Sequence, residues 1–273
     1  MLAKQRQARI LAEIQEHGWA RVTDLTTLLG VSDMTVRRDL DRLASSGSVH
    51  KVHGGAVLNS SGTAADEPGF EAKSALELPA KNAIAAAAAT LIRPGSAIAV
   101  SAGTTTWGLA HHVSGIPGLT IVTNSTTVAD VIANSGRAHD QTVILTGGVR
   151  TPSAALVGPV ADQAIRTLHV DQLFLGVHGM DPHSGFTTPN IAEAETNRAL
   201  IAGADQVIVC ADSTKWGSIG LASFAPLSAA DVVITDSGLP ADARAILTDA
   251  VRSLRLVDVA RDDGVEDAES HAG

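Results

Sequence analysis

The chain has 273 residues, of which 45% are apolar and 18% charged, and its formal net charge is −9. That length predicts about two domains, and the composition excludes a disordered or low-complexity chain. The single cysteine, Cys210, excludes a disulfide framework and a multi-cysteine zinc site. No apolar run approaches the ~18 residues of a membrane span, and the N-terminus is polar, so we expect a cytoplasmic protein with no membrane partner.

Charge is distributed unevenly along the chain. Residues 1–58 hold eight Lys/Arg and six Asp/Glu, a net charge of +2, whereas the remainder holds 12 Lys/Arg and 23 Asp/Glu, a net charge of −11. This asymmetry indicates contact with an anion at the N-terminus. We expect domains at 1–58 and 79–260, a linker at 59–78 and a frayed acidic tail at 261–273.

Apolar spacing predicts three short helices in the first domain, over Arg6–His17, Thr23–Leu29 and Ser32–Ser45. The turn between the second and third helices is about three residues long and contains Gly30, which is typical of a helix-turn-helix. Ser32 is expected to cap the third helix through its hydroxyl. Apolar and polar residues alternate in the segment 48–58, which predicts a two-stranded wing closed by Gly54 and Gly55.

At 100° per residue, the third helix turns an apolar stripe toward the core, formed by Val36, Leu40 and Leu43. The opposite face carries Met34 and Arg38, with Arg37 beside them. Such a helix can enter a major groove, where the arginine fork pairs with guanine or phosphate. From spacing alone, a solvated face with local ion pairs is an equal alternative, because Asp39 and Asp41 reduce the positive charge.

The strings VSDMTVRRDLDRL (Val31–Leu43) and HKVHGGAVL (His50–Leu58) closely resemble the helix-turn-helix signature of the DeoR family of bacterial transcription regulators. The resemblance implies a double-stranded DNA operator as partner. It also implies a set of DNA-facing residues: Ser32, Met34, Thr35, Arg37, Arg38, Lys51 and His53. By their own chemistry, Lys51 is a phosphate contact and either arginine can contact a base or a phosphate.

From Ala80 onward, apolar strands alternate with helices, and the strands are expected at Ala97–Ser101, Leu119–Thr123, Thr142–Thr146, Asp171–Val177, Gln206–Ala211, Asp231–Thr235 and Leu254–Val259. Continuously apolar strands predict an α/β fold whose mainly parallel sheet is covered on both faces. Ligands of such sheets bind beyond the carboxyl ends of the strands. The sequence therefore predicts a ligand site in the loops that follow these strands.

Those loops are rich in hydroxyls or glycine: Ala102–Thr106, Asn124–Thr127, Gly147–Arg150, His178–Asp181 and Asp212–Lys215. Amides at a helix N-terminus with threonine hydroxyls beside them form an anion site, to which Lys215 adds a positive charge. A lone threonine at a helix start is more commonly a cap, and Gly147-Gly148 alone is an ordinary turn. Several such loops at one sheet edge favour a shared site for a phosphorylated molecule with hydroxyls. The expected effector-binding residues are Gly103, Thr104, Thr105, Asn124, Ser125, Gly147, Gly148, Asp212 and Lys215.

Known cofactor motifs are not met, so no cofactor and no metal are expected. Gly103 and Gly108 have Walker A spacing, but Leu109 follows instead of the required lysine, and the ten histidines form no ligand pattern. Two carboxylates from Asp181, Glu193 and Glu195 remain an open alternative, although helical acids are usually solvated. Cys210 is expected to be a small buried residue.

The DeoR resemblance continues through SAGTTTWGLA (Ser101–Ala110), LTGGVR (Leu145–Arg150), FLGVHGMDPHSGFTT (Phe174–Thr188) and ADSTKWG (Ala211–Gly217). It implies a winged helix-turn-helix followed by an effector domain similar in fold to ribose-5-phosphate isomerases, with a sugar phosphate or related metabolite as effector. Ser101 departs from the family pattern, because many members have Asp there.

The resulting hypothesis is a transcriptional repressor of a carbohydrate-metabolism operon, controlled by a phosphorylated sugar. Because such modules read two half-sites, a homo-oligomer, dimer or tetramer, is expected. One alternative is an isomerase-type enzyme with a regulatory helix-turn-helix, against which no acid/base pair is found and fold alone confers no activity. A DNA-coating protein is a third alternative, for which a net charge of +2 is too small.

Overall fold

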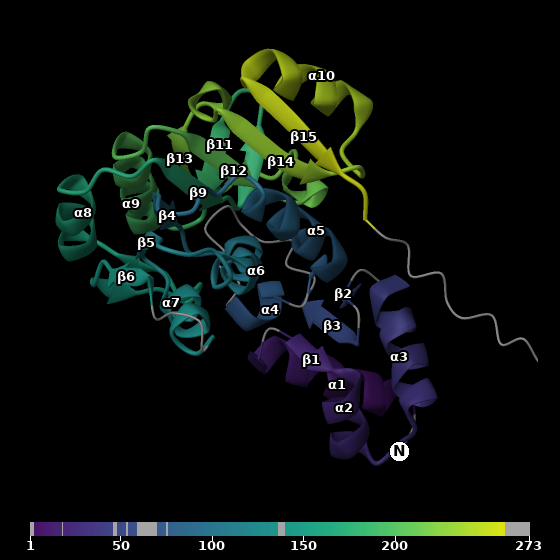
Figure 1. Ribbon diagram of the computed structural model, residues 1–273. Helices are drawn as coiled ribbons and strands as arrows, with labels where there is room; N and C mark the ends of the chain where they lie inside the picture. Colours follow the sequence, from purple (N-terminus) through teal and green to yellow (C-terminus); the bar gives the residue numbers. More distant parts are fainter. Residues whose placement is uncertain are drawn as a thin grey trace, which may run out of the picture.

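The computed structural model describes residues 3–17, 19–45, 48–52, 54–58, 70–74, 76–135 and 140–259. A small N-terminal domain and a larger α/β domain lie side by side, with helix α4 (Phe70–Ser74) at the edge of the larger one (Figure 1). Within these described ranges, no helix is long and apolar enough to cross a membrane.

The N-terminal domain consists of three helices and an antiparallel sheet with the strand order β1-β3-β2. Its elements are α1 (Ala3–His17), β1 (Trp19–Arg21), α2 (Val22–Leu29), α3 (Asp33–Ser45), β2 (Val49–Val52) and β3 (Gly55–Leu58). The three predicted helices are confirmed, but the wing has three strands because β1 pairs with β3. Three residues are too short for a periodic signal. The pairing needs Gly55, since a Cβ there would lie 2.3 Å from the carbonyl oxygen of Ala20.

The turn before α3 has the predicted glycine. Gly30 adopts a φ of 63° and donates its amide to the carbonyl of Thr26 at 2.9 Å, which ends α2. The predicted hydroxyl cap is replaced by a different contact. The Ser32 carbonyl accepts the amides of Thr35 and Val36, while the Ser32 hydroxyl shares a 2.9 Å hydrogen bond with the Thr35 hydroxyl.

The core of the N-terminal domain comes from all three helices. Ile10 and Ile14 of α1, Leu25 of α2, and Val36 and Leu40 of α3 are at most 1% exposed. Burial of one such side chain contributes about 1.5–3 kcal/mol. The apolar stripe predicted for the third helix is therefore the surface that positions α3, and the opposite surface is left to solvent.

The α/β domain contains a seven-stranded parallel sheet in the order β15-β14-β12-β9-β4-β5-β6. Its strands are β4 (Ala97–Val100), β5 (Thr120–Thr123), β6 (Thr142–Leu145), β9 (Gln172–Gly176), β12 (Val207–Cys210), β14 (Val232–Asp236) and β15 (Ser253–Val257). The helices are α5 (Leu78–Ala89), α6 (Thr104–Val113), α7 (Thr126–Ala133), α8 (Pro159–Arg166), α9 (Ile191–Ala202) and α10 (Ala241–Ala250). The predicted parallel α/β architecture is confirmed.

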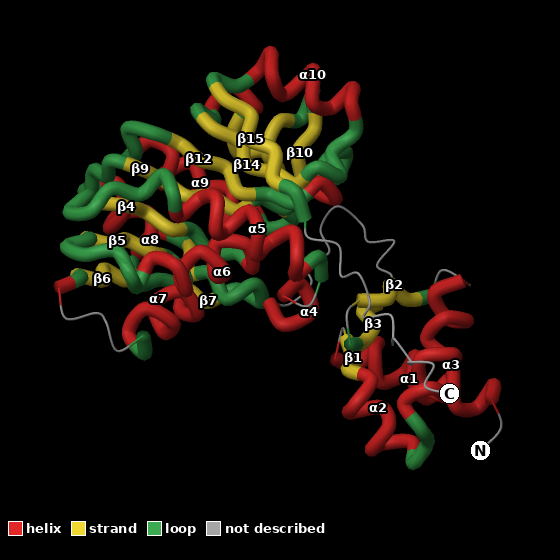
Figure 2. Tube along the Cα trace, turned by 45° about the vertical axis from the view of Figure 1, so that its right-hand side comes forward, coloured by secondary structure: helices red, strands yellow, loops and turns green. Residues whose placement is uncertain are grey.

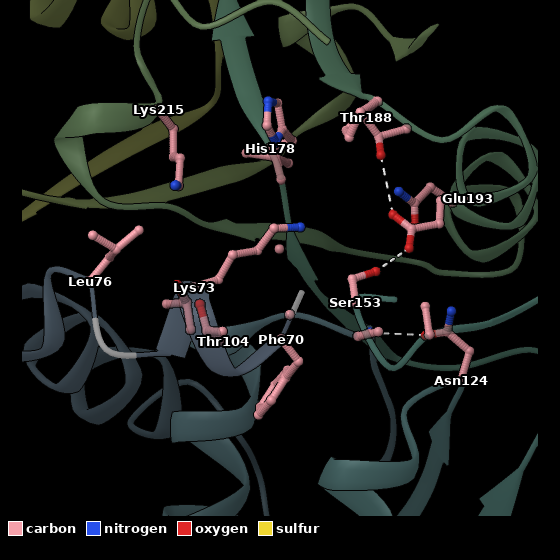
Figure 3. A pocket seen from close by; sticks show the side chains of 18 residues that line it. Phe70, Lys73, Leu76, Thr104, Asn124, Ser153, His178, Thr188, Glu193 and Lys215 are labelled. Atoms are coloured by element: carbon pink, nitrogen blue, oxygen red, sulfur yellow. Dashed lines mark hydrogen bonds between the residues drawn. The ribbon is translucent and has the colours of Figure 1, made fainter. Parts of the chain in front are cut away.

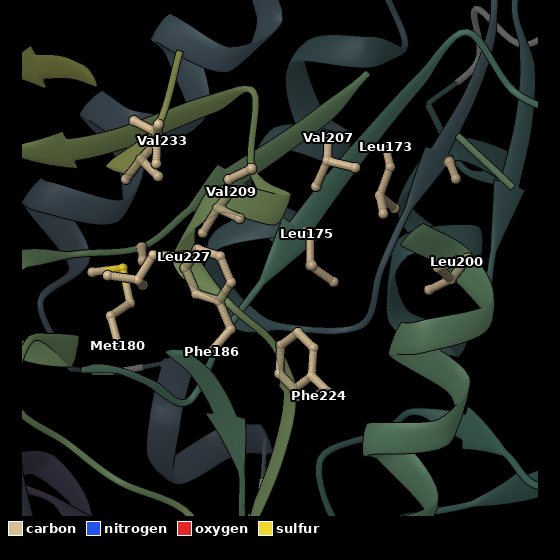
Figure 4. Close-up of a cluster of buried hydrophobic side chains, with 14 of the residues drawn as sticks. Leu173, Leu175, Met180, Phe186, Leu200, Val207, Val209, Phe224, Leu227 and Val233 are labelled. Atoms are coloured by element: carbon tan, nitrogen blue, oxygen red, sulfur yellow. The ribbon is translucent and has the colours of Figure 1, made fainter. Parts of the chain in front are cut away.

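Both faces of this sheet are covered, as the continuous apolar strands predict. In β9, Leu173 and Leu175 belong to a core with Leu200 of α9, whereas Phe174 belongs to a second core with Ile84 of α5. Figure 4 shows the first of these clusters. Alternate side chains of one strand therefore enter two separate cores.

Short antiparallel elements replace two of the expected loops. They are the hairpin of β7 (Val149–Arg150) and β8 (Leu156–Val157), and a sheet of β10 (Gly179–Asp181), β11 (Gly185–Thr188) and β13 (Ala222–Ala225). These strands are two to four residues long, and β13 pairs across a long sequence separation, so local periodicity does not reveal them. Gly179 is required because a Cβ there would lie 1.9 Å from the Ser218 carbonyl oxygen.

Helix α4 falls within the segment predicted as a linker. The amide of Phe70 donates to the carbonyl of Pro152 at 3.2 Å, and its ring packs edge-on against Trp107 of α6 with centroids 5.9 Å apart. The linker residues 59–69 and the acidic tail 261–273 lie outside the described residues.

Candidate functional site

Helix α3 lies at the outer edge of the N-terminal domain in Figure 1, and Figure 2 shows it beside α1 from a second direction. Met34 is 70% exposed, and Arg37 and Arg38 are also exposed, while Val36 is completely buried. The surface predicted to meet DNA is therefore accessible along the N-terminal half of the helix.

The two arginines of this surface differ in their partners. Arg37 donates from Nε to Oδ1 of Asp33 at 2.5 Å, and both side chains are more than half exposed. The hydrogen bond to Asp33 and its charge raise the pKa of Arg37. Arg38 forms no hydrogen bond or ion pair with any described residue. Contact with a DNA phosphate would therefore require Arg37 to exchange Asp33, whereas Arg38 has no such partner among the described residues.

The acids of α3 have different roles. Asp39 is 1% exposed and accepts hydrogen bonds from Arg6 Nε at 2.5 Å and Gln7 Nε2 at 2.9 Å. Burial by itself raises the pKa of Asp39, but the hydrogen bonds from Arg6 and Gln7 outweigh it and hold that pKa below the ordinary value. This carboxylate ties α1 to α3 and is withheld from the DNA-facing surface.

In the wing, Lys51 forms an exposed ion pair with Asp41 of α3. His53, also expected at the DNA, lies outside the described residues. Local ion pairs, the alternative left open by the spacing, are thus present at Arg37 and Lys51. They are compatible with DNA contact because exposed pairs contribute only about 0–1 kcal/mol and exchange readily for phosphate.

A second candidate site is a cavity of about 150 Å³ at the carboxyl ends of β4, β5 and β9 (Figure 3). Five of the predicted effector-binding residues line it, namely Gly103, Thr104, Thr105, Asn124 and Lys215. They follow different strands, and the parallel sheet brings them to one edge.

The loop after β4 runs directly into α6, which begins at Thr104 with Gly103 as its N-cap. The first amides of a helix lack intrahelical partners, and the helix dipole favours a negative charge there. Thr104 is half-buried at the cavity wall. This end of the cavity therefore suits an anionic group.

Two polar residues that follow β5 have structural roles. Asn124 is 2% exposed; its Oδ1 accepts the amide of Ala102 at 2.9 Å and its Nδ2 donates to the carbonyl of Leu156 at 3.2 Å. Ser125 caps α7 by accepting the amide of Val128 and does not line the cavity. Asn124 thus holds the cavity wall in place while facing it.

Three further predicted residues also lie outside the cavity lining: Gly147, Gly148 and Asp212. Gly148 is required for packing, because a Cβ there would lie 2.6 Å from the Val157 carbonyl oxygen. Asp212 is 1% exposed, and its Oδ1 accepts the amide of Thr214. Its Oδ2 forms no hydrogen bond and lies 4.0 Å from Lys215 Nζ. Asp212 therefore acts on the site through Lys215.

A buried lysine, Lys81, completes the positive end and is absent from the prediction. It lies on α5, is 3% exposed, and donates from Nζ to the carbonyl of Lys73 at 2.6 Å. Burial and the nearby charge of Lys215 lower the pKa of Lys81 to about 8. The only sequence signal is a lone lysine within an alanine-rich helix.

Glu193 forms the opposite wall of the cavity. Its carboxylate accepts hydrogen bonds from the hydroxyls of Thr151 at 2.8 Å, Thr188 at 3.1 Å and Ser153. Of the carboxylates considered in the sequence, Asp181 instead accepts the amides of His183 and Ser184. Glu193 is thus not the solvated helical acid that its pattern favours, because a hairpin distant in sequence packs against it.

Ser101 and Cys210 are both structural. The hydroxyl of Ser101, where many family members have Asp, accepts the amide of Gly176 at 2.9 Å and joins β4 to β9. Cys210 is 2% exposed, as expected, and burial raises the pKa of its thiol to about 12. Among the described residues, no group of three or more His, Cys, Asp or Glu side chains is placed to hold a metal ion.

A winged helix-turn-helix joined to a parallel α/β domain with a cavity at its strand ends is the architecture of a transcription regulator with a sensor domain. Comparison with known families specifies which one. Residues 6–62 match the DeoR-like helix-turn-helix domain and residues 77–237 match the DeoR C terminal sensor domain. The chain belongs to the DeoR family and is a transcriptional regulator rather than an enzyme.

Individual relatives align with almost the whole chain. The uncharacterized HTH-type transcriptional regulator YgbI of Escherichia coli K12 is 36% identical over 244 residues, which cover 89% of this chain and 93% of the relative. The glycerol-3-phosphate regulon repressor of the same strain is 30% identical over 258 residues, covering 94% and 100%. Among solved structures, ribose 5 phosphate isomerase A from Neisseria gonorrhoeae overlaps half of this chain and 53% of its own, with 13% identity and a TM-score of 0.36.

Proposed function

We propose that this DeoR-family regulator is a repressor of a carbohydrate-metabolism operon and that a phosphorylated sugar in the cavity sets its affinity for the operator. The observation that carries the proposal is the cavity itself. It combines the N-terminus of α6, Lys215 and a hydroxyl-rich wall at one edge of the sheet. The amides and Lys215 suit a phosphate, and the hydroxyls suit a polyol.

The surface of α3 supplies the DNA contacts in this proposal. Arg37 and Arg38 enter the major groove, Ser32, Met34 and Thr35 lie beside them, and Lys51 and His53 reach phosphates from the wing. Operators for such modules have two half-sites, so the regulator acts as a homo-oligomer, dimer or tetramer, in the cytoplasm where its DNA lies. A relative that is named a glycerol-3-phosphate regulon repressor supports the carbohydrate assignment.

Two measurements test the proposal. The full chain should bind the DNA upstream of its own gene, with an affinity that falls as salt rises; no binding at low salt, with or without sugar phosphates, contradicts it. In a thermal-shift panel of pentose, hexose and glycerol phosphates, at least one compound should raise the melting temperature. Lys215→Ala should abolish that shift and Thr104→Ala should reduce it. An unchanged shift in Lys215→Ala would refute the site assignment.

A further inference from the structure

The effector cavity has walls of opposite charge. Lys215, after β12, lies on one side of it and Glu193 of α9 lies on the other, while the Lys73 side chain extends from α4 into the space between them (Figure 3). Lys81 stands behind the lysine side, close enough for the charge of Lys215 to lower its pKa. A ligand that spans the cavity therefore meets cations at one end and a carboxylate at the other.

The carboxylate of Glu193 is surrounded by hydrogen-bond donors. Every hydrogen bond described above for this group is one that it accepts, from Thr151, Ser153 and Thr188. It also lies in the first turn of α9, where the helix dipole stabilises a negative charge. An ionised carboxylate accepts hydrogen bonds strongly from hydroxyl or amino groups and repels a second anion.

We infer that Glu193 determines the specificity of this cavity: it selects a monophosphate whose far end carries hydroxyl or amino donors and rejects a sugar that carries a second phosphate there. The inference rests on the proposed effector site and narrows its ligand class. Glu193 is half-buried at the cavity wall, so a ligand that fills the cavity would contact it there. Its three hydroxyl donors hold the carboxylate in place before the ligand arrives.

The test compares wild type with Glu193→Gln by calorimetry, using the monophosphates of the panel, fructose 1,6-bisphosphate and inorganic phosphate. Wild type should bind its best monophosphate at least about tenfold more tightly than the bisphosphate, because like charges oppose the second phosphate. Glu193→Gln should weaken the monophosphate about tenfold, the loss expected for a charge-assisted hydrogen bond, and should strengthen the bisphosphate. Inorganic phosphate, which does not reach Glu193 while bound at the lysines, should change less than about twofold and reports that the site is intact.

The outcomes are separable. If no monophosphate binds wild type, the proposed effector fails and this inference fails with it. If a monophosphate binds but Glu193→Gln leaves its preference over the bisphosphate unchanged, only the role of Glu193 is overturned. Should Glu193→Gln fold poorly, Glu193→Asp keeps the charge on a shorter side chain. It should still reject the bisphosphate while binding the monophosphate more weakly, and equal binding of both compounds would contradict the inference.

A second inference comes from a different observation, the position of α4 in the chain. This helix is the first described element after β3 of the DNA-binding domain, and it contributes Phe70 and Lys73 to the cavity wall. The same five residues therefore adjoin both the effector and the segment that leads to the DNA-binding domain.

A helix of five residues is not stable alone, so its contacts determine its position. The contacts described are the amide bond from Phe70 to Pro152, the edge-on packing of Phe70 on Trp107 and the bond from Lys81 to the Lys73 carbonyl. Each partner belongs to the sensor domain beside the cavity. We infer that α4 transmits effector binding to the DNA-binding domain. A ligand between Lys73 and the opposite wall of the cavity would shift the position that this helix adopts.

Phe70→Ala tests this relay, with His111→Ala as the matched control. His111 packs edge-on against Trp107 at 4.8 Å but belongs to α6 and does not line the cavity. With the best phosphate ester at a saturating concentration for each variant, Phe70→Ala should bring the ratio of operator affinities with and without that ester toward one. His111→Ala should keep the wild-type ratio.

Here too the outcomes are distinct. If no phosphate ester alters the operator affinity of wild type, the proposed function and the relay both fail. If wild type responds and Phe70→Ala responds equally, the relay alone is refuted. Phe70→Leu retains apolar contact and, if Phe70→Ala unfolds, should show an intermediate response; a full wild-type response in this variant would also count against the relay.

Discussion

The DNA-binding domain and the sensor domain use positive charge in opposite ways. Lys51 of the wing is about half exposed and paired with the exposed Asp41, whereas Lys81 of the sensor domain is 3% exposed and has its pKa lowered to about 8. The first lysine is solvated until a phosphate arrives. The second is buried behind the cavity wall and does not line the cavity.

This difference determines what each domain responds to. Exposed cations interact with DNA through a field that salt screens within a Debye length of about 8 Å at physiological ionic strength. Buried cations are screened much less, and their protonation depends on pH and on nearby charge. The DNA-binding surface should therefore be sensitive to salt, and the sensor cavity to pH and to ligand chemistry.

The largest expected effect is at Asp39, which is buried although the other acids of α3, Asp33 and Asp41, are exposed. Asp39→Ala removes the buried carboxylate and leaves Arg6, whose side chain is only 14% exposed, without its partner, and should destabilise the DNA-binding domain by roughly 2–3 kcal/mol. Because the folded pKa of Asp39 is lowered, its contribution is present above the ordinary carboxyl pKa and is lost as pH falls through the folded value. Hydrogen exchange of the α1 and α3 amides measures this; equal protection in variant and wild type would mean that the pair is dispensable.

Lys81 provides the next test. Below pH 8 the folded and unfolded states both hold the proton, and the folded state bears the full cost of burying the charge. Between about pH 8 and the ordinary lysine pKa of 10.5 only the unfolded state keeps the proton, so stability should rise with pH across that window. Measured by urea unfolding relative to Lys81→Met, wild type should gain up to about 3 kcal/mol between pH 7 and pH 11. A difference that is constant with pH would show that Lys81 is not buried as a cation.

Arg38 tests whether the exposed arginines read DNA. Arg38→Ala should lower operator affinity about 10–100-fold and leave the melting temperature unchanged, because the side chain has no described partner to lose. Arg252→Ala is the control, since that arginine is 82% exposed on the sensor domain. Fluorescence anisotropy at one fixed salt concentration measures both. Equal losses of operator affinity in the two variants would mean that Arg38 contributes only to the overall charge of the protein.

The smallest effect is expected at Lys51. Lys51→Gln should weaken operator binding modestly and reduce the slope of log affinity against log salt by about one for each DNA-binding domain engaged. Ligand binding to the sensor cavity should keep its wild-type salt dependence in this variant. An unchanged slope for DNA would remove Lys51 from the phosphate contacts.

Much of the fold could be predicted because it depends on local periodicity. The stripe of Val36, Leu40 and Leu43 predicts both the buried and the exposed face of α3, and continuous apolar strands predict a sheet covered on both sides. Gly30 marks the helix end because the left-handed conformation there favours glycine. Elements that depend on long-range pairing, such as β1 and β13, have no comparable local signal.

The same distinction between local and long-range signals applies to the residues of the cavity. The sequence by itself determined that the loops after β4, β5 and β12 meet at one sheet edge, since parallel strands share a carboxyl end, and it thereby placed Thr104 and Lys215 in one site. Only the tertiary structure decided that Glu193, Lys81 and α4 join them. Glu193 is held by hydroxyls from a hairpin about 40 residues away, and the amine of the buried Lys81 donates to a carbonyl of α4. The properties of a charged side chain depend on its surroundings, and the surroundings of a buried charge come from distant parts of the chain.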